Sequence, residues 1–232
     1  MARQIPDDRL PQLLEAATRV FIEQGYRRTQ MADVAAAMGV AKGTLYLYVE
    51  SKEALFDLVC RYADQPPSAG DAPTFPIRSP KAGSTLRYVR EELEKNQAVP
   101  ALTAALGRKR APDAARELGE IVRELYDQLA RNRQRIKLID TSARDYPELA
   151  ALWFEGARGG FVALFAAYLK ARISRGLLAP VPDIGAAARL VLETTVFWAV
   201  HRHFDSRPER ITEELARETV VHFVVHALSS KE

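Results

Sequence analysis

The chain has 232 residues, of which 47% are hydrophobic and 27% are charged, and its formal net charge is +3. This length allows one or two hydrophobic cores, so a small domain joined to a larger one is expected. A net charge this small does not identify a nucleic-acid-binding protein, and such a function must be argued from individual positions. The single cysteine, Cys60, excludes an internal disulfide framework and fits a reducing cytoplasm.

The sequence predicts neither a secretion signal nor a membrane span. The first nine residues mix Arg3 with Asp7 and contain no apolar core. Glu155, Arg158 and Lys170 interrupt the most apolar region, so we expect no stretch of the roughly 18 apolar residues that a membrane span needs. A cytoplasmic protein with no membrane partner is therefore expected.

Apolar residues recur at helical spacing through most of the chain, and glycine and proline mark the breaks. This pattern predicts an all-α protein. The first helix is expected to have Asp7 or Asp8 as its N-cap and to end at Gly25. Thr29 is expected to cap a short second helix that ends before Gly39.

The second and third predicted helices form a helix-turn-helix at about residues 30–49. Such a motif needs a tight turn and a small residue where the two helices cross. Gly39 supplies the left-handed backbone conformation of the turn, and Ala35 supplies the small residue. The third helix is expected to run from about Lys42 to Val49.

Side chains that point away from the inner face of this motif are candidates for DNA contact. The residues spaced to form the inner apolar face are Val34, Met38, Val40, Leu45 and Val49. Lys42, Thr44, Tyr46 and Tyr48 are then expected to face outward on the third helix, whose small or polar start allows close approach to the major groove. From this pattern alone, an ordinary helical hairpin that ends at Gly39 remains the alternative.

Ser51 is expected to cap a fourth helix, which completes an N-terminal domain at residues 7–65. Residues 66–83 are rich in proline and glycine, and we place a linker or loop there. Helical patterns resume after this segment and predict a larger C-terminal domain at residues 84–229.

The last two predicted helices are candidates for a dimer interface. Asp183 is expected to cap one that runs to about His203, and a capping box at residues 206–209 is expected to open the other. The segment from Val220 to Leu228 is apolar nearly all round, which requires burial on more than one side. A two-fold four-helix interface would bury it; closure of the subunit's own core is the alternative. The candidate interface residues are Val191, Trp198, Val220, Phe223, Val224 and Leu228.

Aromatic residues are dense in the predicted C-terminal domain, which is consistent with an apolar, partly aromatic pocket for a small effector. The candidate lining residues are Tyr126, Trp153, Phe161, Phe165 and Phe197. Packing within a core is the alternative for each of them.

His222 and His226 are spaced i, i+4, as a zinc pair would require, but no further ligand accompanies them. We therefore expect histidines packed in a core or an interface, with no metal and no cofactor. An enzyme is not expected either, because the sequence has no Ser-His-Asp spacing and no glycine-rich phosphate loop.

The run TQMADVAAAMGVAKGTLYLYVESKEALFDLV and the preceding LLEAATRVFIEQGY resemble the N-terminal domain of the tetracycline-repressor (TetR) family. The most specific part is GVAKGTLYLYVESKEAL, and the resemblance covers roughly the first 65 residues. It implies a bacterial-type transcription regulator that binds double-stranded DNA as a homodimer on a palindromic operator. It also implies a repressor that a small, largely apolar or aromatic effector releases from the operator.

The resemblance also implies which residues contact DNA. These are Thr29, Gln30, Lys42, Gly43, Thr44, Tyr46, Tyr48 and Lys52. Tyr46 and Lys52 match residues that contact phosphates. Lys42, Thr44 and Tyr48 are the candidates for base edges.

Some positions depart from the family pattern, among them Gln30, Leu47 and Tyr48, so the operator sequence stays open. Repression is the habit of the family and is not visible in these residues. The alternatives are an activator and a protein-binding adaptor of the same fold that no ligand releases from DNA.

Overall fold

The computed structural model describes residues 8–68, 70–97, 99–108, 111 and 113–229 of the chain. Over these residues the regular secondary structure is helical, with one isolated parallel bridge between Val49 and Ile77. This confirms the predicted all-α class. The chain divides into two compact units, residues 1–91 with 134–153 and residues 92–133 with 154–232.

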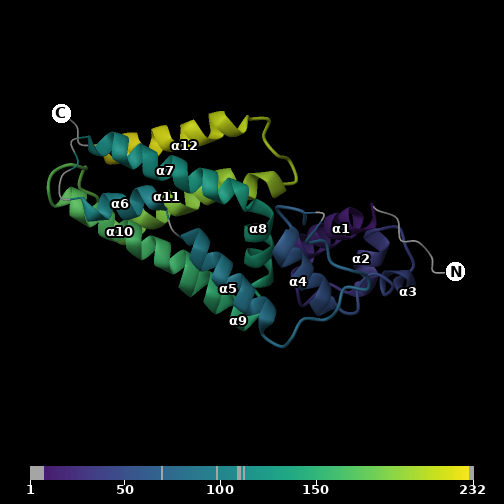
Figure 1. Cartoon of the computed structure of the whole chain (residues 1–232). Helices are drawn as coiled ribbons and strands as arrows, with labels where there is room; N and C mark the ends of the chain where they lie inside the picture. The colour runs from purple at the N-terminus through teal and green to yellow at the C-terminus, as the bar shows by residue number, and fades with distance from the viewer. Residues whose placement is uncertain (1–7, 69, 98, 109–110, 112, 230–232) are drawn as a thin grey trace. The chain divides into compact units, whose positions relative to one another are not determined.

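The first unit contains the predicted helix-turn-helix and the helices that hold it (Figure 1). Its helices are α1 (Arg9–Gln24), α2 (Met31–Ala37), α3 (Lys42–Leu45), α4 (Lys52–Tyr62), the start of α5 (Ser84–Gln97), most of α8 (Arg133–Ser142) and α9 (Pro147–Ala150). Buried apolar faces of α1 and α4 form its core, where the rings of Phe21 and Phe56 meet edge to face at 5.3 Å. Cys60 is fully buried in this core, and burial raises the pKa of its thiol, so it is a structural residue.

Helix α8 belongs to the first unit because polar contacts tie both of its ends to the N-terminal helices. The carboxylate of Asp64 accepts from the backbone N–H groups of Gln134 at 2.8 Å and Arg135 at 3.2 Å. At the other end, the backbone N–H of Tyr26 donates to the hydroxyl of Ser142 at 3.2 Å. The boundary expected at residues 66–83 stays a prediction, and the contacts place residues 134–153 with the N-terminal helices.

Part of the proline-rich segment packs on the helix-turn-helix, and we call residues 75–79 the strap. The backbone N–H of Ile77 donates to Tyr48 O at 2.8 Å, and Ile77 O accepts from Glu50 N at 3.0 Å. Ser79 adds two bonds, from its N–H to the Glu50 carboxylate at 2.9 Å and between its hydroxyl and that of Ser51 at 2.7 Å. The strap thus holds the chain just after α3.

The second unit is a bundle of long helices. They are α6 (Pro100–Gly107), α7 (Ala114–Arg131), α10 (Gly159–Ile173), α11 (Ile184–Ala199) and α12 (Glu213–Leu228), with a 3-10 turn at His201–Phe204. Helices α7 and α12 lie side by side (Figure 1). Inside the bundle, the guanidinium of Arg172 is 2.8 Å from the carboxylate of Glu117 and donates to Ala105 O at 2.6 Å, which joins α10, α7 and α6.

The structure confirms two predicted caps. Ser51 accepts from Ala54 N at 3.1 Å and begins α4, and Asp183 accepts from Ala186 N at 2.6 Å and begins α11. The α-helix from Asp183 ends at Ala199, before the expected His203, and continues as the short 3-10 turn.

The capping box expected at residues 206–209 is wrong. Thr212 is the N-cap of α12, and its hydroxyl accepts from Leu215 N at 3.3 Å. The hydroxyl of Ser206 donates instead to the carboxylate of Asp205, which also accepts from the backbone N–H of Arg207. Ser206 is therefore used in a local turn, as serine often is outside helices.

Among the described residues, one helical run, Pro147–Ile173, is long and apolar enough to cross a membrane by length and composition, with a mean hydropathy of 1.3. The expectation that charged residues exclude every such stretch is therefore wrong for this run. A mostly buried core helix of a globular domain passes the same test, but only 22% of the apolar window of this run is buried, with Phe161, Phe165 and Leu169 among the buried residues of the run. One such run is weak evidence for a membrane location.

Candidate nucleic-acid interface

The turn between α2 and α3 has the predicted left-handed glycine. Gly39 has φ 66°, its N–H donates to Ala36 O at 3.0 Å, and the N–H of Val40 donates to Ala35 O at 3.0 Å. This pair of bonds is the Schellman motif, which ends a helix and reverses the chain. A Cβ at Gly39 would meet nothing within 4 Å, so the requirement for glycine here is purely conformational.

Helix α3 is shorter than predicted, because it ends at Leu45 and two further hydrogen bonds close a turn after it. Leu47 N donates to Thr44 O at 3.1 Å, and Tyr48 N donates to Leu45 O at 2.9 Å. The side chain of Leu45 is fully buried and anchors the element. The exposed residues of α3 and this turn are Lys42, Gly43, Tyr46 and Leu47, and Thr44 is partly exposed.

The prediction that Tyr48 faces outward is wrong, since only 8% of the residue is exposed. Its ring lies edge-on to Phe75 at 5.5 Å, and the guanidinium of Arg9 lies 5.4 Å from its centroid. The physical reason is that α3 has ended before Tyr48 and the strap pairs with the chain there. Tyr48 therefore packs within the first unit and supports the element.

Thr29 does not cap α2 and does not face outward. Its side chain is buried, and its hydroxyl donates to Gly25 O at 2.8 Å. Gln30 is the N-cap of α2 instead, and its backbone N–H donates to the carboxylate of Asp33 at 2.9 Å. Gln30 is exposed, whereas Thr29 holds the loop that precedes α2.

Lys52 lies at the start of α4, where its ammonium joins α4 to the loop before α2. It donates to Arg27 O and Thr29 O, each at 3.2 Å, and lies 4.7 Å from the ring centroid of Tyr26. An ammonium has three N–H donors, so two such bonds leave one donor for a ligand. Burial and the hydrogen bond to Glu53 raise the pKa of the Tyr26 hydroxyl, which therefore stays a donor at neutral pH.

The predicted effector-pocket residues have different environments. Tyr126, Phe161 and Phe165 are buried within the second unit, and the hydroxyl of Tyr126 donates to the carboxylate of Glu213 at 2.7 Å. Trp153 is buried in the first unit, where its indole N–H donates to Asp140 at 3.0 Å. Phe197 is 44% exposed, and its placement in a pocket wall stays a prediction.

The predicted interface residues also differ in their exposure. Val191, Val220, Val224 and Leu228 are buried within the second unit itself, so the prediction that these four form an exposed interface is wrong for the isolated chain. Trp198 is half-buried. Phe223 is 69% exposed, as an interface residue of a separated subunit would be. Helical spacing identified α12 as an apolar helix, but it did not show which face of that helix is buried within the same subunit.

Sequence reasoning missed two exposed residues on these helices, Leu215 of α12, which is 56% exposed, and Leu190 of α11. Leu190 of α11 is 67% exposed, and it lies seven positions before Phe197, on the same helix face. The i, i+7 spacing of these two large residues was the available signal.

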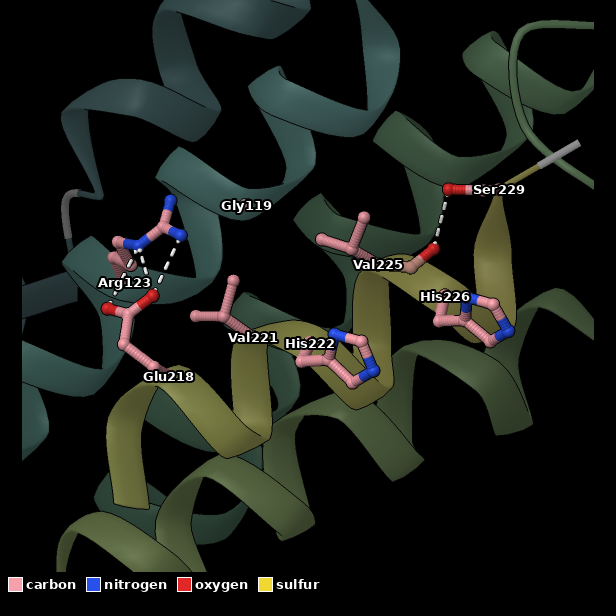
Figure 2. A pocket seen from close by; sticks show the side chains of 8 residues that line it. All are labelled: Gly119, Arg123, Glu218, Val221, His222, Val225, His226 and Ser229. Carbon is pink, nitrogen blue, oxygen red and sulfur yellow. Dashed lines mark hydrogen bonds and ion pairs between the residues drawn. The ribbon is translucent and has the colours of Figure 1, made fainter. Parts of the chain in front are cut away.

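A groove of about 480 Å³ lies between α7 and α12 (Figure 2). Gly119 lines it on α7, where a Cβ would lie 3.3 Å from Nη1 of Arg123 and 3.6 Å from side-chain atoms of Val221 and Val225. The ion pair between Arg123 and Glu218, at 2.8 Å, lies at one end.

His222 and His226 lie along this groove with their rings nearly parallel and 5.8 Å apart, as the i, i+4 spacing requires. Both are exposed, so packing in the core of the chain is wrong for them, and a place in an interface stays a prediction. Within the described part of the chain, no group of three or more His, Cys, Asp or Glu side chains is placed to hold a metal ion.

A Schellman turn between two short helices, with exposed side chains on the second, defines the class of helix-turn-helix proteins. Residues 13–59 match the model of the family described as bacterial regulatory proteins, tetR family. The N-terminal domain is therefore a tetR-family domain.

Among curated proteins, the chain is similar to the HTH-type transcriptional repressor KstR2 of Rhodococcus jostii (strain RHA1), with 40% identity over 53 residues, or 23% of this chain and 26% of that protein. It is 48% identical over 50 residues to the HTH-type transcriptional regulator YhgD of Bacillus subtilis (strain 168), which is 22% of this chain and 26% of that protein. The matched stretches span about a quarter of the length of these relatives.

Solved structures resemble the chain over nearly its whole length. The ketosteroid transcriptional regulator KstR2 of Mycobacterium tuberculosis superposes with a TM-score of 0.56 at 16% identity, covering 100% of both chains. A bacterial regulatory protein of the tetR family from Rhodococcus RHA1 gives a TM-score of 0.56 at 20% identity, covering 96% of this chain and 98% of that one. At such identities the likeness concerns the fold, including that of the helical second unit.

Proposed function

We propose that the chain is a cytoplasmic, dimeric transcription regulator that represses by binding a palindromic DNA operator. The observation that carries the proposal is the set of exposed side chains on α3 and its turn, Lys42, Gly43, Tyr46 and Leu47, directly after the Schellman turn. Small residues at the start of such an element let its backbone approach the major groove. The names of curated relatives, one of them a transcriptional repressor, support the same function.

The exposed residues suit different roles in this interface. Lys42 and Thr44 are the proposed contacts to base edges, because lysine can donate to the guanine acceptors N7 and O6. The Tyr46 hydroxyl and the remaining N–H of Lys52 are the proposed contacts to phosphates. Exposed Gln30 precedes α2 and is proposed to contact the DNA backbone. Thr29 is buried and is not among the proposed contacts.

The proposed dimer uses α11 and α12. Their exposed residues Leu190, Phe197 and Phe223 form apolar surface that a second copy would cover. In a two-fold dimer the two α3 elements would meet successive major grooves about 34–36 Å apart, which matches a palindromic operator.

The proposed effector is a small, largely apolar molecule held in the second unit. One curated relative, 45% identical over 42 residues, is named the fatty acid metabolism regulator protein of Bacillus subtilis (strain 168), and the KstR2 structure is described as a ketosteroid regulator. Phe161, Phe165 and Tyr126 remain the proposed contacts. Such an effector would weaken DNA binding if it favoured a conformation in which the two α3 elements no longer fit the operator.

Fluorescence anisotropy with duplex DNA from upstream of the gene tests the DNA-binding proposal. Tyr46→Phe removes one hydroxyl and should weaken binding by about tenfold on every sequence, as loss of a charge-assisted hydrogen bond does. Lys42→Ala should weaken binding, whereas Lys170→Ala, a matched change at an exposed lysine of α10, should not. Unchanged affinity in both interface variants would contradict the proposed interface and favour a protein-binding adaptor.

A further inference from the structure

Leu47 is an exposed leucine that the fold of the first unit does not use. Among the described residues of this unit, the large hydrophobic side chains left exposed are Tyr46, at 43%, and its neighbour Leu47, at 55%. Leu45, two positions earlier, is fully buried, and Val49, two positions later, is also fully buried. Leu47 therefore stands between residues that anchor the element and is itself turned to solvent.

The backbone on both sides of Leu47 is fixed by hydrogen bonds. Its own N–H donates to Thr44 O at 3.1 Å, and the next residue, Tyr48, donates to Leu45 O and accepts from the strap residue Ile77. The buried ring of Tyr48 adds packing against Phe75. A side chain held on such a rigid base loses little freedom when it meets a ligand, so its contact is specific in position.

The surface next to Leu47 would meet the major groove in the proposed function. A leucine side chain has no donor or acceptor, so it can gain nothing from phosphates or from the polar base edges. The apolar group that the major-groove edge presents is the C5-methyl of thymine. At the same place a cytosine would bury its N4 amino group against leucine without a partner, which is unfavourable.

We infer that Leu47 is a specificity-determining residue that reads the C5-methyl group of a thymine in each operator half-site. The inference rests on the proposed function and adds a base preference to it. Tyr46 is assigned to a phosphate and Lys42 to guanine, and Thr44 is less exposed than Leu47, which makes Leu47 the most accessible apolar side chain for the thymine. Burial of the leucine side chain against the methyl group should improve affinity by about fourfold per methyl.

Deoxyuridine tests this inference because it differs from thymidine only by the missing C5-methyl. The preferred duplex is first selected from a random pool with the full-length chain. Each thymine of that duplex is then replaced, one at a time, by deoxyuridine, and binding of the wild type, Leu47→Ala and Leu47→Met is measured. Leu47 is exposed, so the thermal midpoints of the variants should match that of the wild type.

At one thymine per half-site, the wild type and Leu47→Met should lose about fourfold in affinity on deoxyuridine. Leu47→Ala loses the contact in both half-sites, so it should bind the unmodified duplex about sixteenfold more weakly. It should match the wild type on a duplex that carries deoxyuridine at this thymine in both half-sites, and the two changes together should cost no more than one. Additive losses at every thymine, or no effect of deoxyuridine, would overturn this inference alone. If no sequence is selected, the proposed function fails and this inference fails with it.

Discussion

Single residues fix the backbone turns of the N-terminal domain, and two glycines are examples. Gly25 and Gly39 both have positive φ, at 78° and 66°, and both end a helix of the N-terminal domain. Their surroundings differ, because a Cβ at Gly25 would lie 3.2 Å from the backbone oxygen of Thr141. The sequence indicates both turns, but it does not reveal that α8 lies against one of them.

Alanine at these glycines should therefore have unequal effects. Gly39→Ala should lower the free energy of unfolding by about 1–2 kcal/mol, the cost of the left-handed conformation for a residue with a Cβ. Gly25→Ala should cost about 1–3 kcal/mol more, because the new methyl group also displaces backbone. Urea denaturation of both variants measures the difference, and equal losses would contradict the contact between Gly25 and α8.

Tyr48 marks the limit of sequence reasoning at the residue scale. The helix-turn-helix and its glycine turn could be predicted from local spacing and from a resemblance. The burial of Tyr48 depends on the strap residue Phe75, which is distant in sequence. Thr29 is similar, since its hydroxyl satisfies the carbonyl of Gly25 in a loop that no local pattern describes.

At the scale of elements, the strap is the unexpected feature of the first unit. A segment rich in proline reads as a linker, yet Ile77 is buried and exchanges hydrogen bonds with Tyr48 and Glu50. Caps made by neighbouring side chains, as at Ser51 and Asp183, were predictable because their chemistry is local. The end of α3 at Leu45 was not, because pairing with the strap replaces further helical turns.

The strap should keep the turn after α3 ordered. Ile77→Ala removes buried apolar atoms that hold the strap in place, so the amide of Glu50, which donates to Ile77 O, should exchange with solvent faster than in the wild type. Arg78→Ala, at the adjacent exposed position, is the matched control and should leave that rate unchanged. Hydrogen exchange followed by NMR measures the exchange rate of the Glu50 amide in both variants. Equal protection in the two variants would show that the strap does not hold the turn.

At the scale of the whole molecule, the second unit carries a cluster of charges around Glu213. Arg133 donates to its carboxylate at 2.9 Å, and the guanidinium of Arg202 and the ring of His203 lie 3.3 and 3.2 Å from it. Burial, Arg133 and Arg202 lower the pKa of His203 below its ordinary value. Burial opposes ionisation of Glu213, but hydrogen bonds from Tyr126 and Arg133 outweigh it and lower the pKa of that carboxyl.

Both shifts make the fold less stable in acid. Below the ordinary histidine pKa of about 6.5, His203 binds a proton in the unfolded chain but resists it in the folded chain. The free energy of unfolding therefore falls as the pH drops below about 6.5. The contribution of Glu213 is lost at lower pH, below its ordinary value of about 4.3.

His203→Gln should therefore reduce the fall in the urea midpoint between pH 7.5 and pH 5.5, relative to the wild type. The remaining histidines, His201, His222 and His226, stay in place in this variant. An identical fall in wild type and variant would show that His203 does not control stability in this range.

The exposed apolar residues of α11 and α12 predict the assembly of the molecule. Phe223→Glu places a charge on the proposed interface, which a two-fold contact would bury twice, so the variant should be a monomer where the wild type is a dimer. Light scattering at micromolar concentration gives both masses. Leu164→Glu, at an exposed apolar site of α10, is the control and should stay dimeric. A wild-type monomer would contradict the proposed dimer.

Sequence-specific DNA binding is the central claim, and a ratio of two dissociation constants tests it most directly. Binding of the full-length chain is measured at about 150 mM salt to the duplex selected from a random pool and to a duplex of the same composition in scrambled order. Preference for the selected duplex by about a thousandfold or more is the predicted result, as for other specific regulators. Equal dissociation constants for the two duplexes would contradict it.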